Sequence, residues 1–294
     1  MALQGSGAIS LLNLATEFGG TAPHSMSEYY RGGGIVPNNN AGVPTSGVIS
    51  LSDFYGAVAA IVLDITSNTS DYNILTAATA AGYNAASDTT PVIVNVAAGV
   101  DITATSGNSG ITTGALNAAS DVTINVAATA TVCGFDGAQG ANGGLDTAGS
   151  AGGNGTDAIL FAITSGTGTY AVVNSGTVGG GSGGGGGAGG GGSAGARYTE
   201  TAVKGGYECN APNVYGSNGS SGTAGTSGTS CQAQNGTSGT AGTSGTYPTN
   251  NCAITVGAGS GGAGGAGGTA GKAVNFGGLT VSASGGGTYY GATS

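Results

Sequence analysis

The side chains that most often carry out catalysis or bind metals are scarce in this chain of 294 residues. Its single histidine, His24, lies between a proline and a serine, with no cysteine or aspartate nearby in the sequence. One histidine does not complete a usual zinc set, and none of the cysteines forms a C-x-x-C pair. Nothing resembles the strained turn that presents a nucleophilic serine. The sequence therefore predicts no metal, no cofactor and no catalytic residue.

Carboxylates are the remaining candidates for catalysis, because glycosidases use a pair of them. Those after the first 57 residues are scattered, and the chain has no tryptophan on which a sugar ring could stack. They are Asp64, Asp71, Asp88, Asp101, Asp121, Asp136, Asp146, Asp157, Glu200 and Glu208. We expect the protein not to be an enzyme, with a glycan depolymerase as a less favoured alternative.

The charge distribution excludes several classes of partner. The net charge is −9, and the only basic residues besides His24 are Arg31, Arg197, Lys204 and Lys272. Binding to nucleic acid or to an anionic membrane needs clustered lysine and arginine. No apolar run is long enough to span a bilayer, and no basic stretch precedes the first apolar one. We expect no nucleic acid, no membrane insertion and no signal peptide.

Binding is the chemistry that the C-terminal third offers. Arg197, Tyr198, Tyr207, Tyr215 and Tyr247 lie in connectors between glycine-rich runs. Tyrosine provides a large, rigid and amphipathic contact surface at low entropic cost. These five residues are the predicted receptor-binding residues. The alternative is that the tyrosine rings cover the ends of the glycine-rich runs.

The runs that separate these connectors have glycine at every third position. Such steps cover Gly180–Gly195, Gly219–Gly228, Gly236–Gly245 and Gly259–Gly271, and shorter ones cover Gly137–Gly143 and Gly149–Gly155. Polyproline II geometry has three residues per turn, so each run would present a stripe without side chains. Neighbouring backbones could then approach and hydrogen-bond, as in a polyglycine-II bundle. A flexible linker is the main alternative, and six prolines are too few for collagen.

Two of the runs predict a disulfide. Gly219–Thr229 and Gly236–Thr246 have nearly the same sequence and a short connection, which favours an antiparallel hairpin. Such a hairpin places Cys209 and Cys252 at one end and Cys231 at the other. We predict a bond between Cys209 and Cys252, with free thiols or a bond from Cys231 to another connector as alternatives.

The first 57 residues form a separate module that contains an internal repeat, SGAISL at 6–11 and SGVISL at 46–51. Short helices are predicted at Leu11–Phe18, Met26–Arg31 and Leu51–Tyr55. Ser10 and Ser50 would cap two of them, and Ser25 with Glu28 would form a capping box on the third.

This module resembles one found in structural and tail proteins of tailed bacteriophages. The strings EFGG at 17–20, SEYYRGGG at 27–34 and PTSGVISLSDFYG at 44–56 account for the resemblance. It implies a virion-attachment module that binds other phage tail proteins.

Residues 58–178 are predicted to be a β-rich stem. Strands are expected at Ile61–Ile65, Val92–Val96, Val122–Val126, Ala158–Ile163 and Tyr170–Asn174, with a single helix at Asp71–Tyr83. Strands of similar sequence recur 30 residues apart and alternate apolar with polar residues, which suits a β-solenoid or a sandwich.

A β-rich stem followed by period-three glycine runs resembles the tip adhesins of T-even-type long tail fibres. The resemblance implies a mainly β protein with a polyglycine-II domain at 179–294 that binds a host surface protein or glycan. It also implies a place in the virion tail, and a homo-oligomer such as a trimer is compatible with it. A purely structural tail subunit is the alternative function, and an ice-binding surface is a more distant one.

Overall fold

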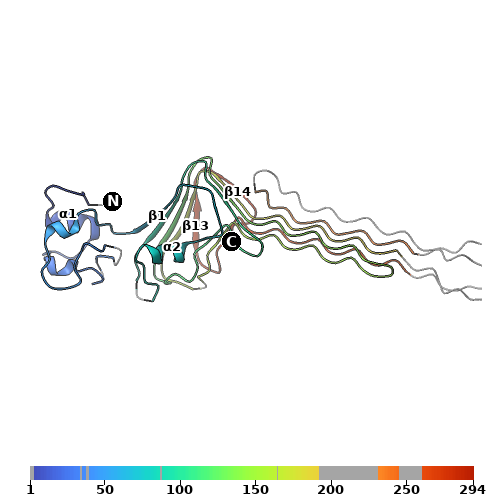
Figure 1. Ribbon diagram of the computed structural model, residues 1–294, viewed down its shortest axis with the longest axis horizontal. Coiled ribbons are helices and arrows are strands. Elements are labelled where there is room, and N and C mark those ends of the chain that lie inside the picture. Colours follow the sequence, from blue (N-terminus) through green and yellow to red (C-terminus); the bar gives the residue numbers. More distant parts are fainter. Residues whose placement is uncertain are drawn as a thin grey trace, which may run out of the picture.

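Three parts follow one another along the long axis of the molecule (Figure 1). The computed structural model describes residues 3–33, 35–37, 40–86, 88–163, 165–191, 231–244 and 260–294. A small helical module lies at one end, parallel β-sheets form the middle, and glycine-rich segments extend from the sheets at the other end. The protein is therefore mainly β, with few helices.

The N-terminal module contains α1 (Leu11–Phe18) and the 3₁₀ helices η1 (Met26–Tyr29) and η2 (Leu51–Phe54). Two of the predicted caps are confirmed: the Ser10 side chain accepts from the N–H of Asn13, and Ser25 and Glu28 form a capping box. Ser50 is the N-cap residue of η2, but there its N–H donates to the Asp53 carboxylate at 2.8 Å. Both 3₁₀ helices end before their predicted limits because Tyr30 and Tyr55 leave the helical conformation. A core of their own holds these helices together: Ile9, Leu14, Tyr29, Val36, Val43, Phe54 and Ala57.

The middle part consists of three sheets in which every described strand pairs in parallel. The first sheet has the order β1-β4-β7-β10-β13, with β1 at Ile61–Ile65, β4 at Val92–Val96, β7 at Val122–Val126, β10 at Tyr170–Asn174 and β13 at Val281–Ser284. The second has the order β14-β11-β8-β5-β2, with β2 at Thr69–Ser70, β5 at Asp101–Thr103, β8 at Thr131–Cys133, β11 at Thr177–Gly179 and β14 at Thr288–Tyr290. The third has the order β12-β9-β6-β3, with β3 at Tyr72–Asn73, β6 at Ile111–Thr112, β9 at Ile159–Leu160 and β12 at Val274–Asn275.

Each turn of chain thus adds one strand to each sheet in succession, which is the arrangement of a β-solenoid. The strands of the first sheet alternate inward and outward residues. In β4 and β7, for example, the valines and isoleucine at alternate positions are buried. Side chains at aligned positions of successive coils, such as Val94, Ile124 and Val172, stack into a continuous apolar core. Their burial stabilises the coils.

Two elements predicted in the middle part are shorter than expected. The strand predicted at Ala158–Ile163 is only β9, because after Leu160 the N–H of Ala162 donates to the side chain of Thr113, 2.8 Å away. The helix predicted at Asp71–Tyr83 is only α2 (Ile74–Ala80). It starts late because Tyr72–Asn73 pairs with Ile111–Thr112, after which Asn73 caps the helix.

One corner of the solenoid differs greatly from coil to coil. Between the second and third sheets, the first coil has only Asp71 and the second coil has residues 104–110. Asp71 adopts a φ of 51° and accepts hydrogen bonds from Thr105 and Asn108, which lower the pKa of its carboxyl group. The third coil inserts residues 134–158 at this corner, and the fourth inserts residues 180–273.

These two insertions supply the glycine-rich segments. We name them segment A (134–144), segment B (147–157), segment C (180–191), segment D (231–244) and segment E (260–272). Segments A and B run antiparallel, with Thr156 donating to Phe135 and Gly153 to Ala138. Segment C runs parallel to A and D and antiparallel to B and E, as its backbone hydrogen bonds show.

Segment C is the centre of this assembly, and every residue from 178 to 191 is buried. The N–H groups of Gly184 and Gly187 donate to segment B, and those of Gly183 and Gly186 donate to segment D. Carbonyl groups of segment C accept from segments A and E. The bonds recur every third residue at 2.7–2.9 Å, so the backbone is satisfied by its neighbours.

The boundary predicted at residue 179 does not separate the solenoid from the glycine-rich segments. Segments A and B lie before it but hydrogen-bond with segments C and E. Strands β12, β13 and β14 lie after it but complete the three sheets. The chain leaves the solenoid and returns to it twice, which a linear division of the sequence does not describe.

Candidate functional site

The predicted receptor-binding residues Arg197, Tyr198, Tyr207, Tyr215 and Tyr247 lie outside the described residues. The structure does locate the residues that flank them. Residues 192–230 begin after Gly191 and end before Cys231, and residues 245–259 begin after Ser244 and end before Ser260. The positions of these flanking residues show where each connector leaves and rejoins the described segments.

Three of the points where the connectors leave or rejoin the described segments lie together, at the end of the glycine-rich segments that is far from the solenoid. The N–H of Asp146, in the turn between segments A and B, donates to Gly191 at 2.9 Å. Gly262 donates to Gly190 at 2.7 Å, and Gly242 donates to Gly262 at 2.8 Å. The starts of both connectors and the return of the second therefore lie beside the turn, at the far end (Figure 1).

The turn itself presents a feature that the sequence analysis did not select. Leu145 is 46% exposed, and Asp146 adopts a φ of 56°, which is unusual for a residue other than glycine. The signal in the sequence is Gly143-Gly144-Leu145-Asp146, which interrupts the period-three glycines between two runs. Leu145 is thus an apolar side chain near the start of the first connector and near both flanks of the second.

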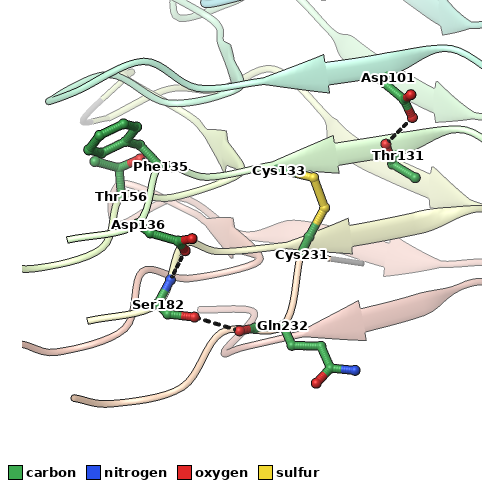
Figure 2. The surroundings of a disulfide bond; sticks show 9 residues. All are labelled: Asp101, Thr131, Cys133, Phe135, Asp136, Thr156, Ser182, Cys231 and Gln232. Atoms are coloured by element: carbon green, nitrogen blue, oxygen red, sulfur yellow. Dashed lines mark hydrogen bonds between the residues drawn. A yellow bond between two sulfur atoms is a disulfide. The ribbon is translucent and has the colours of Figure 1, made fainter. Parts of the chain in front are cut away.

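At the opposite end, a disulfide joins Cys133, the last residue of β8, to Cys231, the first described residue of segment D (Figure 2). Their Cα atoms are 5.2 Å apart. The side chain of Ser182 donates to the carbonyl of Gln232 at 2.8 Å, and Gly183 donates to Gln234 at 2.8 Å. Segment D therefore starts at the base of the bundle, covalently attached to the solenoid.

The predicted partners Cys209 and Cys252 lie outside the described residues, so their bond stays a prediction. The alternative was a bond from Cys231 to another connector, whereas its partner Cys133 is the last residue of strand β8. The 30-residue repeat could have identified Cys133, because Thr131-Val132-Cys133 occupies the place of Asp101-Ile102-Thr103. Val132 is buried in this rung, so the side chain of Cys133 points outward.

Other candidate chemistry is sparse in the described residues. His24 lies 3.2 Å from the Tyr29 hydroxyl and 3.9 Å from a carboxylate oxygen of Glu28, within the N-terminal module. No three of the described histidine, cysteine, aspartate and glutamate side chains are grouped as metal ligands would be. Among the described helices, none has the length and apolarity needed to cross a membrane.

Two comparisons with known proteins give matches over most of the chain. A family described as phage tail fibre adhesin Gp38 matches residues 60–294, which begin two residues after the N-terminal module. The chain is also similar to the crystal structure of the gp37–gp38 adhesin tip complex of the bacteriophage S16 long tail fiber. The identity is 18% and the TM-score is 0.36, over 97% of this chain and 96% of that one. No curated protein matches the chain. Because the family covers the whole solenoid and all glycine-rich segments, this chain belongs to the phage tail fibre adhesin Gp38 family.

Proposed function

We propose that this adhesin attaches a phage to its host by binding a surface protein or glycan, without catalysis, through residues 192–230 and 245–259. The observation that supports this assignment is the position of the flanking residues. Gly191, Ser244 and Ser260 all belong to the end of the bundle that is farthest from the solenoid. A surface at that end meets the host first when the opposite end of the molecule is held by the fibre.

The composition of the two connectors fits a binding surface. Arg197, Tyr198, Tyr207 and Tyr215 lie in the first connector, and Tyr247 lies in the second, which has no charged residue. Tyrosine and arginine are enriched at the centres of protein interfaces, where they provide most of the binding energy. Leu145, exposed at the neighbouring turn, would add an apolar contact to this surface.

The glycine-rich segments are best explained as a polyglycine-II bundle that supports these connectors. Three residues per turn direct successive N–H groups to three sides, and segment C donates in turn to its neighbours with this period. A Cβ added at Gly184 or Gly186 would overlap a backbone carbonyl of segment A or E. Such a bundle is rigid without a large apolar core, so it would hold the connectors far from the solenoid.

The N-terminal module is the part that we assign to attachment within the virion tail. It lies outside the residues matched by the adhesin family, and it has its own core. Its surface exposes large apolar side chains, with Val48 at 92% and Leu12 at 72%. Exposed apolar groups of this size are favourable contacts for another tail protein. A trimeric arrangement of the chain stays a prediction.

Inhibition of phage adsorption by the purified protein tests this assignment. We expect the full chain to occupy receptors and to block adsorption in proportion to its concentration. The variant Tyr215→Ala/Tyr247→Ala should block poorly but still assemble into virions. Val48→Asp, at the other end, should block as well as the wild type but assemble poorly. A wild-type protein that assembles normally and never blocks adsorption would indicate a purely structural subunit.

A further inference from the structure

We propose that aspartate and asparagine side chains carry the strand register of the solenoid into the glycine-rich bundle and so position the receptor-binding end. Each forms what we call a two-point clamp. The side chain accepts a hydrogen bond from the N–H of a residue on the neighbouring segment. The N–H of the next residue in its own chain donates to the carbonyl of that same neighbouring residue. Only the role in positioning connectors rests on the proposed function.

Two clamps join segments A and C. The carboxylate of Asp136 accepts from the N–H of Ser182 at 2.7 Å, and Gly137 donates to the carbonyl of Ser182 at 2.7 Å (Figure 2). Asn142 and Gly143 repeat this geometry on Ala188, at 3.0 Å and 2.7 Å. In both clamps the partner is 46 residues farther along the chain.

Two further clamps join segments B and E. Asn154 accepts from the N–H of Thr269 at 3.0 Å, and Gly155 donates to its carbonyl at 2.8 Å. Asp157 accepts from Lys272 at 2.7 Å, and Ala158 donates back at 2.9 Å. The separation in sequence is 115 residues in both cases. The second oxygen of Asp157 accepts from Asn275 in β12, which ties this clamp to the third sheet.

These separations are those of the strands that adjoin the segments, β8 and β11 before segments A and C, and β9 and β12 after segments B and E. In the second sheet Cys133 pairs with Gly179, the same 46-residue offset as in the clamps on segment C. In the third sheet Ile159 pairs with Val274, the same 115-residue offset as in the clamps on segment E. The bundle therefore continues the register of the sheets along its length.

The solenoid contains the same device at the start of β7. Asp121 accepts from the N–H of Thr169 at 2.6 Å, and Val122 donates to the carbonyl of Thr169 at 2.9 Å. Their 48-residue offset is that of β7 and β10, in which Val122 pairs with Tyr170. The clamp thus occurs in both architectures, between parallel neighbours in each case.

Glycines alone do not fix this register. If one segment slipped by three residues along its neighbour, each contact position that needs glycine would again be occupied by glycine. The close backbone contacts would therefore survive the slip. The clamps occur at a few positions only, and a slip would leave some of their acceptors and N–H groups without partners. The N–H groups of Ser182 and Ala188 belong to residues that are only 1% exposed, where a missing acceptor is costly.

Hydrogen exchange of the backbone amides, measured on the full-length protein, tests the proposal directly. Asn142→Leu/Asn154→Leu removes two acceptors at similar side-chain size, whereas Asn142→Asp/Asn154→Asp keeps the accepting oxygen. Ala151→Leu is the matched control, because it adds leucine to segment B without removing an acceptor. We expect the leucine double variant to exchange about tenfold faster at Ala188 and neighbouring amides of segment C, with β7 unchanged. The aspartate variant and the Ala151 control should exchange like the wild type.

Blocking of adsorption provides the second measurement. The leucine double variant should block at least several-fold less well than the aspartate variant if the clamps position the connectors. Equal exchange in the leucine double variant and the Ala151 control would overturn the register proposal. Faster exchange in the leucine double variant, together with full blocking of adsorption, would overturn the positioning role. Failure of the wild type to block would instead overturn the proposed function, because the exchange rates do not depend on a host.

Discussion

The solenoid and the glycine-rich bundle of this adhesin share one register but bury different parts of the chain. In the solenoid, Val92, Ile124 and Val172 are fully buried, and the coils are stabilised by apolar side chains removed from water. In segment C the buried atoms are those of the backbone itself, because ten of its twelve residues, 180–191, are glycine. The comparison shows that a continuous fold can pass from side-chain packing to backbone packing without changing its alignment.

The two architectures must therefore respond in opposite ways to side-chain size. Removing methyl groups from the solenoid core leaves a cavity, whereas adding one to the bundle forces backbones apart. Hydrogen bonds become the main cohesive interaction in the bundle, since its contacts include few large apolar groups. Matched substitutions in each part can separate these two sources of stability.

The largest effect is expected from Gly186→Val in segment C. The new Cβ would overlap the carbonyl of Gly265, and the backbone of segment E cannot yield without losing several hydrogen bonds. We expect a loss above about 4 kcal/mol, as for the most damaging core changes. Thermal unfolding should show the bundle lost and the solenoid retained. Ser238→Val, on an exposed position of segment D, is the control and should change stability little. Equal melting of both variants would contradict backbone packing.

The converse change is Ile124→Ala in β7. This side chain is fully buried between the rungs formed by Val94 and Val172, so its loss leaves a cavity in the solenoid. Truncation of a buried isoleucine costs about 2–5 kcal/mol. Denaturant unfolding should report the loss, while amides of segment C should exchange as in the wild type until the solenoid unfolds. Ala188→Gly in the bundle is the paired variant, and a loss as large as that of Ile124→Ala would contradict the comparison.

A smaller effect is expected from reduction of the bond between Cys133 and Cys231. It closes a loop that contains segments A, B and C, with a sequence separation of 98 residues. Disulfides of native proteins typically contribute about 2–4 kcal/mol, mainly by restricting the unfolded chain. A reducing agent should lower the melting temperature of the wild type but not of Cys133→Ser/Cys231→Ser. Peptide mapping without reduction should recover the two cysteines together, and recovery of Cys231 with Cys209 or Cys252 would contradict the bond.

The sequence predicted the regular elements well and the insertions poorly. The strands at Ile61–Ile65, Val92–Val96, Val122–Val126 and Tyr170–Asn174 are confirmed with their limits, because five alternating residues suffice to define a buried face. The strands of two or three residues, such as Thr69–Ser70 and Ile111–Thr112, were not predicted. Alternation cannot be recognised over so few positions, and their pairing depends on residues in other coils.

The candidate site shows the same limit. Period three predicts which residues belong to the glycine-rich runs, but it does not tell which runs are neighbours. Segments A and C, 46 residues apart, are adjacent only because the strands before them, β8 and β11, are paired. The bond of Cys133 follows from that arrangement and not from the spacing of the cysteines. Knowledge of the coil repeat would have been needed to place both.

The smallest expected effect, Gly153→Ser, tests how finely the rules of the bundle hold. Between the antiparallel segments A and B, backbone N–H groups of segment B donate to carbonyl groups of segment A. Side-chain hydroxyl groups of segment B accept hydrogen bonds from N–H groups of segment A. Thr156 accepts from the N–H of Phe135 at 2.7 Å, and Ser150 accepts from the N–H of Ala141 at 2.7 Å. Gly153 occupies the equivalent place opposite Ala138 and has no hydroxyl to offer.

A serine at this position should therefore stabilise the bundle. Its Cβ would lie 3.0 Å from the nitrogen of Ala138, a tight contact that a shift of a few tenths of an ångström relieves, and its hydroxyl could accept from that N–H. Replacing glycine also restricts the unfolded chain, so a gain of about 0.5–1 kcal/mol is expected, or about 1–4 °C in melting temperature. The adjacent Gly152→Ser is the matched control, because its Cβ would overlap the carbonyl of Gly184 in segment C and should destabilise strongly. If both serines lowered the melting temperature alike, the effect of replacing a glycine would not depend on which neighbouring segment that glycine faces. That result would contradict this prediction.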